Sequence, residues 1–93
     1  MQVVWSAGFT KSVKRLQRQS PNLKNPIAQA LTQLETDPFH SSLRTHKLKG
    51  DLSNCYACSV TYSDRIVFKF VMNPDSEEEE VLLLAIGSHD EVY

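Results

Sequence analysis

The sequence predicts one small α+β domain over residues 1–93, an antiparallel sheet with an αα-hairpin on one face, in the order β-α-α-β-β-β. Two observations carry this prediction. Apolar residues recur at helical spacing in the first half of the chain, whereas strand-like apolar runs fill the second half. A length of 93 residues suits a single domain, and 41% apolar with 23% charged residues excludes a collagen-like or wholly disordered chain.

Two helices joined by a short turn are predicted in the first half. Phe9, Val13 and Leu16 recur with the helical period, and Ser-Pro-Asn at 20–22 ends that pattern. The Asp-Pro pair at 37–38 ends the second helix. A second apolar stripe lies between these breaks: Leu23, Ile27, Ala30, Leu31 and Leu34.

Three strands are predicted in the second half, at 55–61, 65–72 and 81–86. The last of them is apolar on both faces, which is typical of a central strand that is buried on both sides. Successive hairpins place these strands side by side in chain order. A short β-prone segment at 2–5 must then pair elsewhere, and residues 37–50 are expected to be mostly loop.

The charges are divided unevenly along the chain. Residues 1–50 hold eight basic and two acidic side chains, a net charge of +6, whereas residues 51–93 hold two basic and nine acidic ones, a net charge of −7. A basic half can bind a polyanion, although a solvated helix face explains the same composition. Four of the basic residues fall on the first helix: Lys11, Lys14, Arg15 and Arg18.

The cysteines, Cys55 and Cys58, have the C-x-x-C spacing of many zinc and redox sites. They fall in a predicted strand, where residues three apart point to opposite faces. We therefore expect two unrelated thiols, with neither a metal nor another cofactor. No apolar run is long enough for a membrane helix and no signal peptide is visible, so the expected location is cytoplasmic, without membrane contact.

Candidate catalytic residues lie at the ends of the predicted strands. His89 follows the most apolar strand, Arg65 begins the one before it, and Tyr93 ends the chain. His46, Lys47 and Lys49 place three potential cations in one short loop, which suits a phosphate. Each of these residues has an ordinary alternative as a surface charge, a solvated loop or a chain end.

These residue types suffice for cleavage of RNA without a metal. A base takes the proton of the 2′-OH, an acid protonates the leaving 5′-oxygen, and cations stabilise the transition state. Two histidines, an arginine, lysines and a tyrosine provide all these groups. The chain has no P-loop, dinucleotide-binding or zinc-protease motif.

An ordered set of motifs resembles the RelE/ParE superfamily of bacterial toxins. It comprises F-T-K-S-V-K-R-L at 9–16, D-P at 37–38, H-K-L-K-G at 46–50, D-R-I-V-F at 64–68 and I-G-S-H-D-E-V-Y at 86–93. The resemblance spans nearly the whole chain and implies the same β-α-α-β-β-β fold. Many members are ribosome-dependent mRNA interferases, which cut mRNA in the ribosomal A site without a metal and are neutralised by a co-expressed antitoxin.

The YafQ-like group is the most similar one, because His46, His89 and Tyr93 match its histidines and C-terminal aromatic residue. Arg65 matches an arginine of RelE proper. The resemblance implies His89 and His46 as acid and base in either order, Arg65 as the phosphate ligand and Tyr93 as the residue that orients the nucleotide. It further implies contacts of the basic residues with RNA, including 16S rRNA for the first helix, and a cognate antitoxin, ribosome and mRNA as partners.

One catalytic position departs from the pattern. Ala57 and Ser59 stand where RelE proper has two lysines, and Ser59 stands where the YafQ group has another histidine. The group's catalytic aspartate aligns with Ser63 or Asp64. Two alternatives therefore stay open: a ParE-like inhibitor of DNA gyrase that cuts no RNA, and a degenerate member that only binds its antitoxin.

Overall fold

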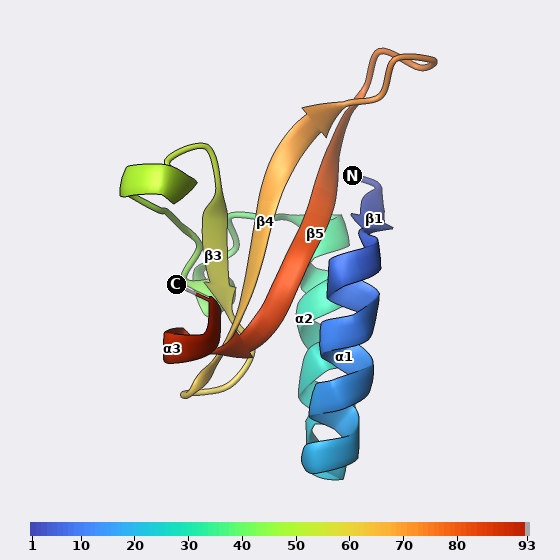
Figure 1. The fold of residues 1–93 in the computed structure, drawn as a ribbon. Coiled ribbons are helices and arrows are strands. Elements are labelled where there is room, and N and C mark those ends of the chain that lie inside the picture. Colours follow the sequence, from blue (N-terminus) through green and yellow to red (C-terminus); the bar gives the residue numbers. More distant parts are fainter. Residues whose placement is uncertain (93) are drawn as a thin grey trace.

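The structure, a computed structural model, describes residues 1–92, with the backbone alone at 90 and 91. Two antiparallel helices lie against one face of a twisted sheet (Figure 1). The elements in chain order are β1 (Val3–Trp5), α1 (Ala7–Gln19), α2 (Lys24–Thr36), β2 (His46–Lys47), β3 (Tyr56–Ser59), β4 (Asp64–Met72), β5 (Glu79–Ser88) and α3 (His89–Val92). Three 3₁₀ helices lie between them: η1 (Pro21–Leu23), η2 (Ser41–Leu43) and η3 (Gly50–Leu52).

The α+β class and the helical hairpin are confirmed. Helix α1 begins where the Ser6 hydroxyl accepts a hydrogen bond from the Phe9 amide at 3.0 Å, which satisfies one of the free N–H groups of the first turn. The helix ends before Ser20, and η1 forms the short connection to α2. Pro26 lies in the first turn of α2, where its missing N–H costs no hydrogen bond.

The sheet is mixed rather than wholly antiparallel, which differs from the prediction. The strand order is β1-β5-β4-β3-β2, and β1 runs parallel to β5 with Val3 opposite Val81. Strand β4 occupies one edge of β5, so the other edge is free for β1. The chain then turns directly into α1, where the Ser6 amide donates to the Leu83 carbonyl at 3.1 Å.

The region expected to be mostly loop contributes the fifth strand. Strand β2 has only two residues, and His46 lies opposite Ala57 of β3. The sequence could not predict it, because a two-residue strand has no periodicity. Strands β4 and β5 are one and four residues longer than predicted, and β3 is shorter at both ends.

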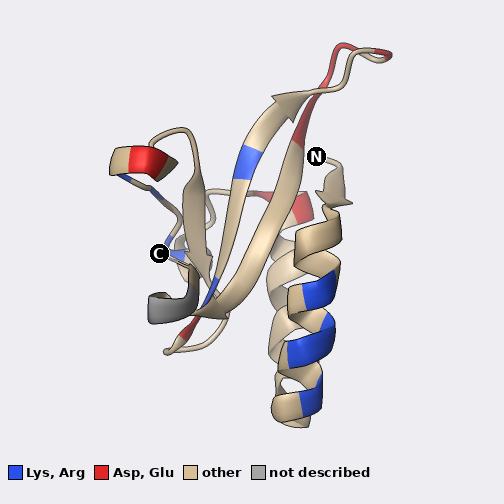
Figure 2. Ribbon diagram, viewed as in Figure 1, with Lys and Arg blue, Asp and Glu red and all other residues tan. Residues whose placement is uncertain are grey.

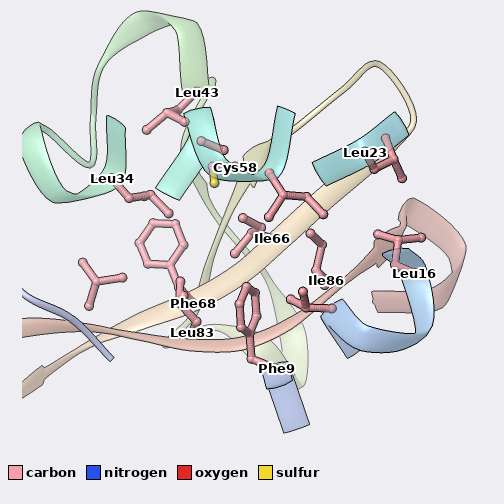
Figure 3. Packing of buried hydrophobic residues seen from close by; sticks show 14 residues of the cluster. Phe9, Leu16, Leu23, Leu34, Leu43, Cys58, Ile66, Phe68, Leu83 and Ile86 are labelled. Atoms are coloured by element: carbon pink, nitrogen blue, oxygen red, sulfur yellow. The ribbon is translucent and has the colours of Figure 1, made fainter. Parts of the chain in front are cut away.

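The main core fills the space between the helices and the sheet. Phe9 of α1 and Leu34 of α2 meet Phe68 and Leu83 of the sheet, and all four are fully buried (Figure 3). Cys58 and Ile66 belong to the same cluster. These buried positions show which face of each strand points toward the helices. The alternate residues of each strand therefore lie on the opposite face of the sheet.

Candidate active site

Two of the predicted site residues, His46 and Arg65, lie on the face of the sheet away from α1 and α2, which we call the open face. Because successive strand residues point to opposite sides, the core residue Cys58 places Ala57 and Ser59 on the open face. Residues directly opposite in an antiparallel pair share a face. His46 lies opposite Ala57 and Arg65 lies opposite Ser59, so both belong to the open face.

His46 is exposed, and its ring is oriented by the backbone. Its Nδ1 lies 3.1 Å from the carbonyl oxygen of Arg44. A carbonyl only accepts hydrogen bonds, so the neutral ring carries its proton on Nδ1. The lone pair is then on Nε2, which suits this side chain for taking a proton from a substrate hydroxyl.

Arg65 is half-buried and held at one nitrogen. Its Nη1 donates to the Thr61 carbonyl at 2.7 Å and to the Asp64 carbonyl at 3.0 Å. These acceptors fix the guanidinium without neutralising it, and no carboxylate within the described residues forms an ion pair with Arg65. The other guanidinium nitrogens remain available for a phosphate.

His89 is exposed and begins α3, directly after β5. Gly87, two residues earlier, lies opposite Arg65, and Ser88 lies opposite Asp64. Helix α3 packs on β4 and β5 and lies on the other side of the sheet from α1 (Figure 1). His89 therefore lies at the end of the β4–β5 ladder where β4 begins, near Arg65, the second residue of that strand. Tyr93 lies outside the described residues.

His46 reaches this region from β2. Strands in a sheet are about 4.8 Å apart, so β2 and β4 are separated by about 10 Å. Val67 of β4 lies opposite Ala57, which in turn lies opposite His46, so these three residues are aligned across the sheet. Arg65 lies two residues before Val67 along β4. A single nucleotide can span this separation.

The lysines and arginines predicted to bind RNA do not all lie on the open face with His46. Lys47 is opposite Tyr56, whose ring packs against the core, so it leaves the sheet on the other face from His46. Lys49 precedes η3 and lines a separate cavity with Leu48 and Asp51. The basic side chains of α1 are exposed and follow the helix behind the sheet (Figure 2): Lys11, Lys14, Arg15 and Arg18. They form a second surface, remote from the open face.

Ser59 and Asp64 stand at positions where the sequence departs from, or aligns uncertainly with, the catalytic pattern of the related toxins. Ser59 is half-buried opposite Arg65 and offers only a hydroxyl. Asp64 is partly buried, and its Oδ2 accepts a hydrogen bond from the Thr61 hydroxyl at 2.8 Å. Asp64 thus stabilises the turn between β3 and β4.

Arg44 was not among the predicted site residues, yet the structure brings it to the same cavity as Arg65. The two arginines line one cavity of about 330 Å³ together with hydroxyl-bearing side chains: Ser42, Ser59, Thr61 and Tyr62. Arg44 lies in an irregular segment without periodicity, so only its charge was visible in the sequence. Among the described residues, neither histidine lines this cavity.

The two cysteines are free thiols, as predicted, and both are buried. Burial raises the pKa of the Cys58 thiol to about 12, against smaller opposing effects of a hydrogen bond with Ile66 and the charge of Arg65. Within the described residues, no three histidine, cysteine or carboxylate side chains gather as metal ligands. Among the same residues, no helix has the length and apolar character needed to cross a membrane.

Comparison with known proteins decides the family. The model of the family described as "Bacterial toxin of type II toxin-antitoxin system, YafQ" matches residues 1–93. The chain belongs to the YafQ family. It is therefore a toxin of a type II toxin–antitoxin system, and the RelE/ParE resemblance of its motifs is confirmed. A comparison with curated protein sequences finds no significant match.

Solved structures of related toxins share the fold of this YafQ family member. YafQ from E. coli strain BL21(DE3) is 16% identical, with a TM-score of 0.79 over 99% of this chain and 97% of that one. A YoeB/ParE toxin from Agrobacterium tumefaciens is 19% identical, with a TM-score of 0.76 over 96% and 99% of the two chains. The E. coli DinJ–YafQ complex matches at 18% identity and a TM-score of 0.73, over 99% and 97%.

Proposed function

We propose that this YafQ family toxin is a ribosome-dependent mRNA interferase, an endoribonuclease that cleaves mRNA in the A site without a metal. The observation that supports the proposal is that His46 and Arg65 share the open face of the sheet, while His89 begins α3 two residues after Gly87, which lies opposite Arg65. The Nδ1 proton of His46 is directed to the Arg44 carbonyl, and Arg65 has no carboxylate partner among the described residues. Both features suit a substrate that brings a hydroxyl and a negative charge.

The chemistry follows from these groups. His46 takes the proton of the 2′-OH at Nε2, the 2′-oxygen attacks the phosphorus, and the bond to the 5′-oxygen breaks. His89 gives a proton to the leaving 5′-oxygen, so a 2′,3′-cyclic phosphate and a 5′-hydroxyl are formed. Arg65 stabilises the charge that develops on the phosphoryl oxygens. Tyr93 is proposed to orient the nucleotide, on the strength of the motif alone.

The ribosome is the proposed platform for this reaction. The basic surface of α1 lies behind the sheet, where it can contact 16S rRNA while the open face is turned to the mRNA (Figure 2). Lys47 and Lys49 are exposed near the other edge and are proposed as further RNA contacts. Backbone phosphates attract such surfaces irrespective of sequence.

A cognate antitoxin is the proposed protein partner. The E. coli DinJ–YafQ complex has the same toxin fold as this chain. The exposed Trp5 and Phe39 offer apolar contacts to such a partner, and the strand edges β1 and β2 offer backbone hydrogen bonds.

The test is to map RNA 5′ ends on purified ribosomes programmed with a defined mRNA, with and without the protein. New ends at the A-site codon, absent with the H89A variant, support the proposal. The absence of new ends with folded, ribosome-bound protein overturns it. A parallel DNA supercoiling assay with gyrase detects the alternative, a gyrase inhibitor of the ParE kind.

A further inference from the structure

The cavity lined by Arg44 and Arg65 has the composition of a nucleotide site. It lies between η2 and the adjoining ends of β3 and β4, and it measures about 330 Å³. Two of its lining residues are arginines, Arg44 and Arg65, and no carboxylate residue lines it. Two guanidinium groups at one cavity favour an anion, although the Asp64 carboxylate lies nearby, bonded to the Thr61 hydroxyl.

Arg44 is free to bind a ligand. It is exposed, and its guanidinium has no hydrogen bond or ion pair with any residue that the structure describes. Arg65 is fixed only through Nη1, by two backbone carbonyls. One side of the cavity therefore has a preorganised guanidinium and the other an adaptable one.

The backbone of Arg44 supports a role for its side chain. The residue has φ 51° and ψ 39°, in the left-handed region where glycine is favoured over residues with a Cβ. A glycine would end η2 at lower conformational cost. What an arginine adds at this position is its guanidinium.

Tyr62 indicates what kind of anion the cavity accepts. Its side chain is 96% exposed, although it lines the same cavity as the arginines. An exposed aromatic ring beside a phosphate site can stack on a base, which gives affinity without sequence preference. Ser59 adds a hydroxyl group suited to a sugar or a phosphate, whereas the hydroxyls of Ser42 and Thr61 already bond to His40 and Asp64.

We propose that this cavity binds one nucleotide of single-stranded RNA, with its phosphate between Arg44 and Arg65 and its base stacked on Tyr62. This inference deepens the proposed function and rests on it for the identity of the ligand. It adds Arg44 and Tyr62 as binding residues. The carbonyl of Arg44 orients His46, so the same residue connects nucleotide binding to the orientation of the proposed base.

The experiment measures binding without cleavage. The probe is a 2′-O-methylated RNA hexanucleotide, which cannot react through its 2′-oxygen, and the full chain is titrated by amide NMR. We expect shifts at residues 44, 59–62 and 65. The R44G variant should weaken binding by about tenfold, because a charged hydrogen bond is lost while the backbone is relieved. Y62A should weaken it by about fivefold or more, and Y62F should not.

Glu77 provides the matched control. It is also a non-glycine residue with positive φ, 59°, but it lies at the distant tip of the β4–β5 hairpin. E77G should leave the affinity for the hexanucleotide unchanged. Equal affinities of R44G and the parent protein would overturn the proposal, as would shifts confined to α1. This experiment does not measure cleavage. If the hexanucleotide binds in this cavity but the protein cuts no mRNA on ribosomes, the proposed function is refuted and the nucleotide site stands.

Discussion

Ser59 lies directly opposite Arg65 across the antiparallel pair of β3 and β4, on the open face of the sheet. Its side chain is small, and both residues line the cavity that also contains Arg44. At a position where relatives are expected to carry a histidine or lysine, this chain has a hydroxyl beside a fixed guanidinium. Under the proposed function, the catalytic groups are therefore His46, Arg65 and His89.

Replacing His89 tests the proton transfer. H89A should lower the rate of A-site cleavage by a factor of about 10²–10⁴, the usual contribution of a positioned acid or base. The assay is single-turnover cleavage on programmed ribosomes. His40 provides the control, because its Nδ1 accepts a hydrogen bond from the Ser42 amide at 3.1 Å and thereby starts η2. H40N keeps an acceptor there and should cleave normally; an unchanged rate in H89A would refute the assignment.

Arg65 should not be replaceable by lysine. The guanidinium donates to two carbonyls through Nη1, and the proposed function assigns the phosphate to its other nitrogens. An ammonium has all its donors on one atom and lacks the fork geometry that reaches both sets of acceptors. We expect R65K to lose a factor of about 10²–10³ in the cleavage rate. Circular dichroism should show an unchanged fold. A lysine variant with parental activity would show that only the charge matters.

The basic face of α1 should govern affinity for ribosomes rather than the rate of cleavage. Replacing Lys11, Lys14 and Arg18 by glutamine should weaken ribosome binding and make it less dependent on salt. The slope of log K against log salt should fall by about two to three, since each phosphate contact contributes about 0.7–0.9. K24Q, which neutralises an exposed lysine at the start of α2, is the control. Equal slopes in the triple variant and the parent would place the ribosome on another surface.

Cys58 should make stability depend on pH in the alkaline range. Its folded pKa, about 12, lies above the ordinary value of 9.0 because burial disfavours the thiolate. The stabilising contribution is therefore complete below pH 9 and is lost as the pH rises toward 12. Between these values the unfolding free energy should decrease by up to about 1.4 kcal/mol per pH unit from this group.

Urea titrations of the parent protein and C58A isolate that contribution, since other groups titrate equally in both. The difference between their unfolding free energies should shrink as the pH rises above 9. Thiol reagents at pH 8 should also leave Cys58 unmodified until the protein unfolds. A difference that stays constant with pH, or rapid modification of the folded protein, would contradict the buried thiol.

The sequence predicted what periodicity can show. The stripe of Phe9, Val13 and Leu16 identified α1 and its buried face, and the apolar run around Leu83 identified the strand that lies between β1 and β4. The parallel pairing of β1 was not predictable, because three residues carry no information on direction. Strand β2 was missed for a similar reason.

The residues of the candidate site also differ in whether the sequence could predict them. His89 and Arg65 follow from strand ends, which the apolar pattern locates. Arg44 depends on a left-handed turn after η2 and on a cavity between segments distant in sequence. Neither leaves a trace in the local sequence, and only the fold brings Arg44 beside Arg65.

Dependence of cleavage on the ribosome can be tested with two mRNAs that differ only in the position of the start codon, shifted by three nucleotides. Ribosomes are stalled at initiation on each, the protein is added, and the 5′ ends are mapped. The proposed function predicts one cut in the A-site codon of each mRNA, moved by three nucleotides between them and absent from free mRNA. Cuts at fixed sequences in both mRNAs, or on free mRNA alone, would contradict ribosome-dependent cleavage.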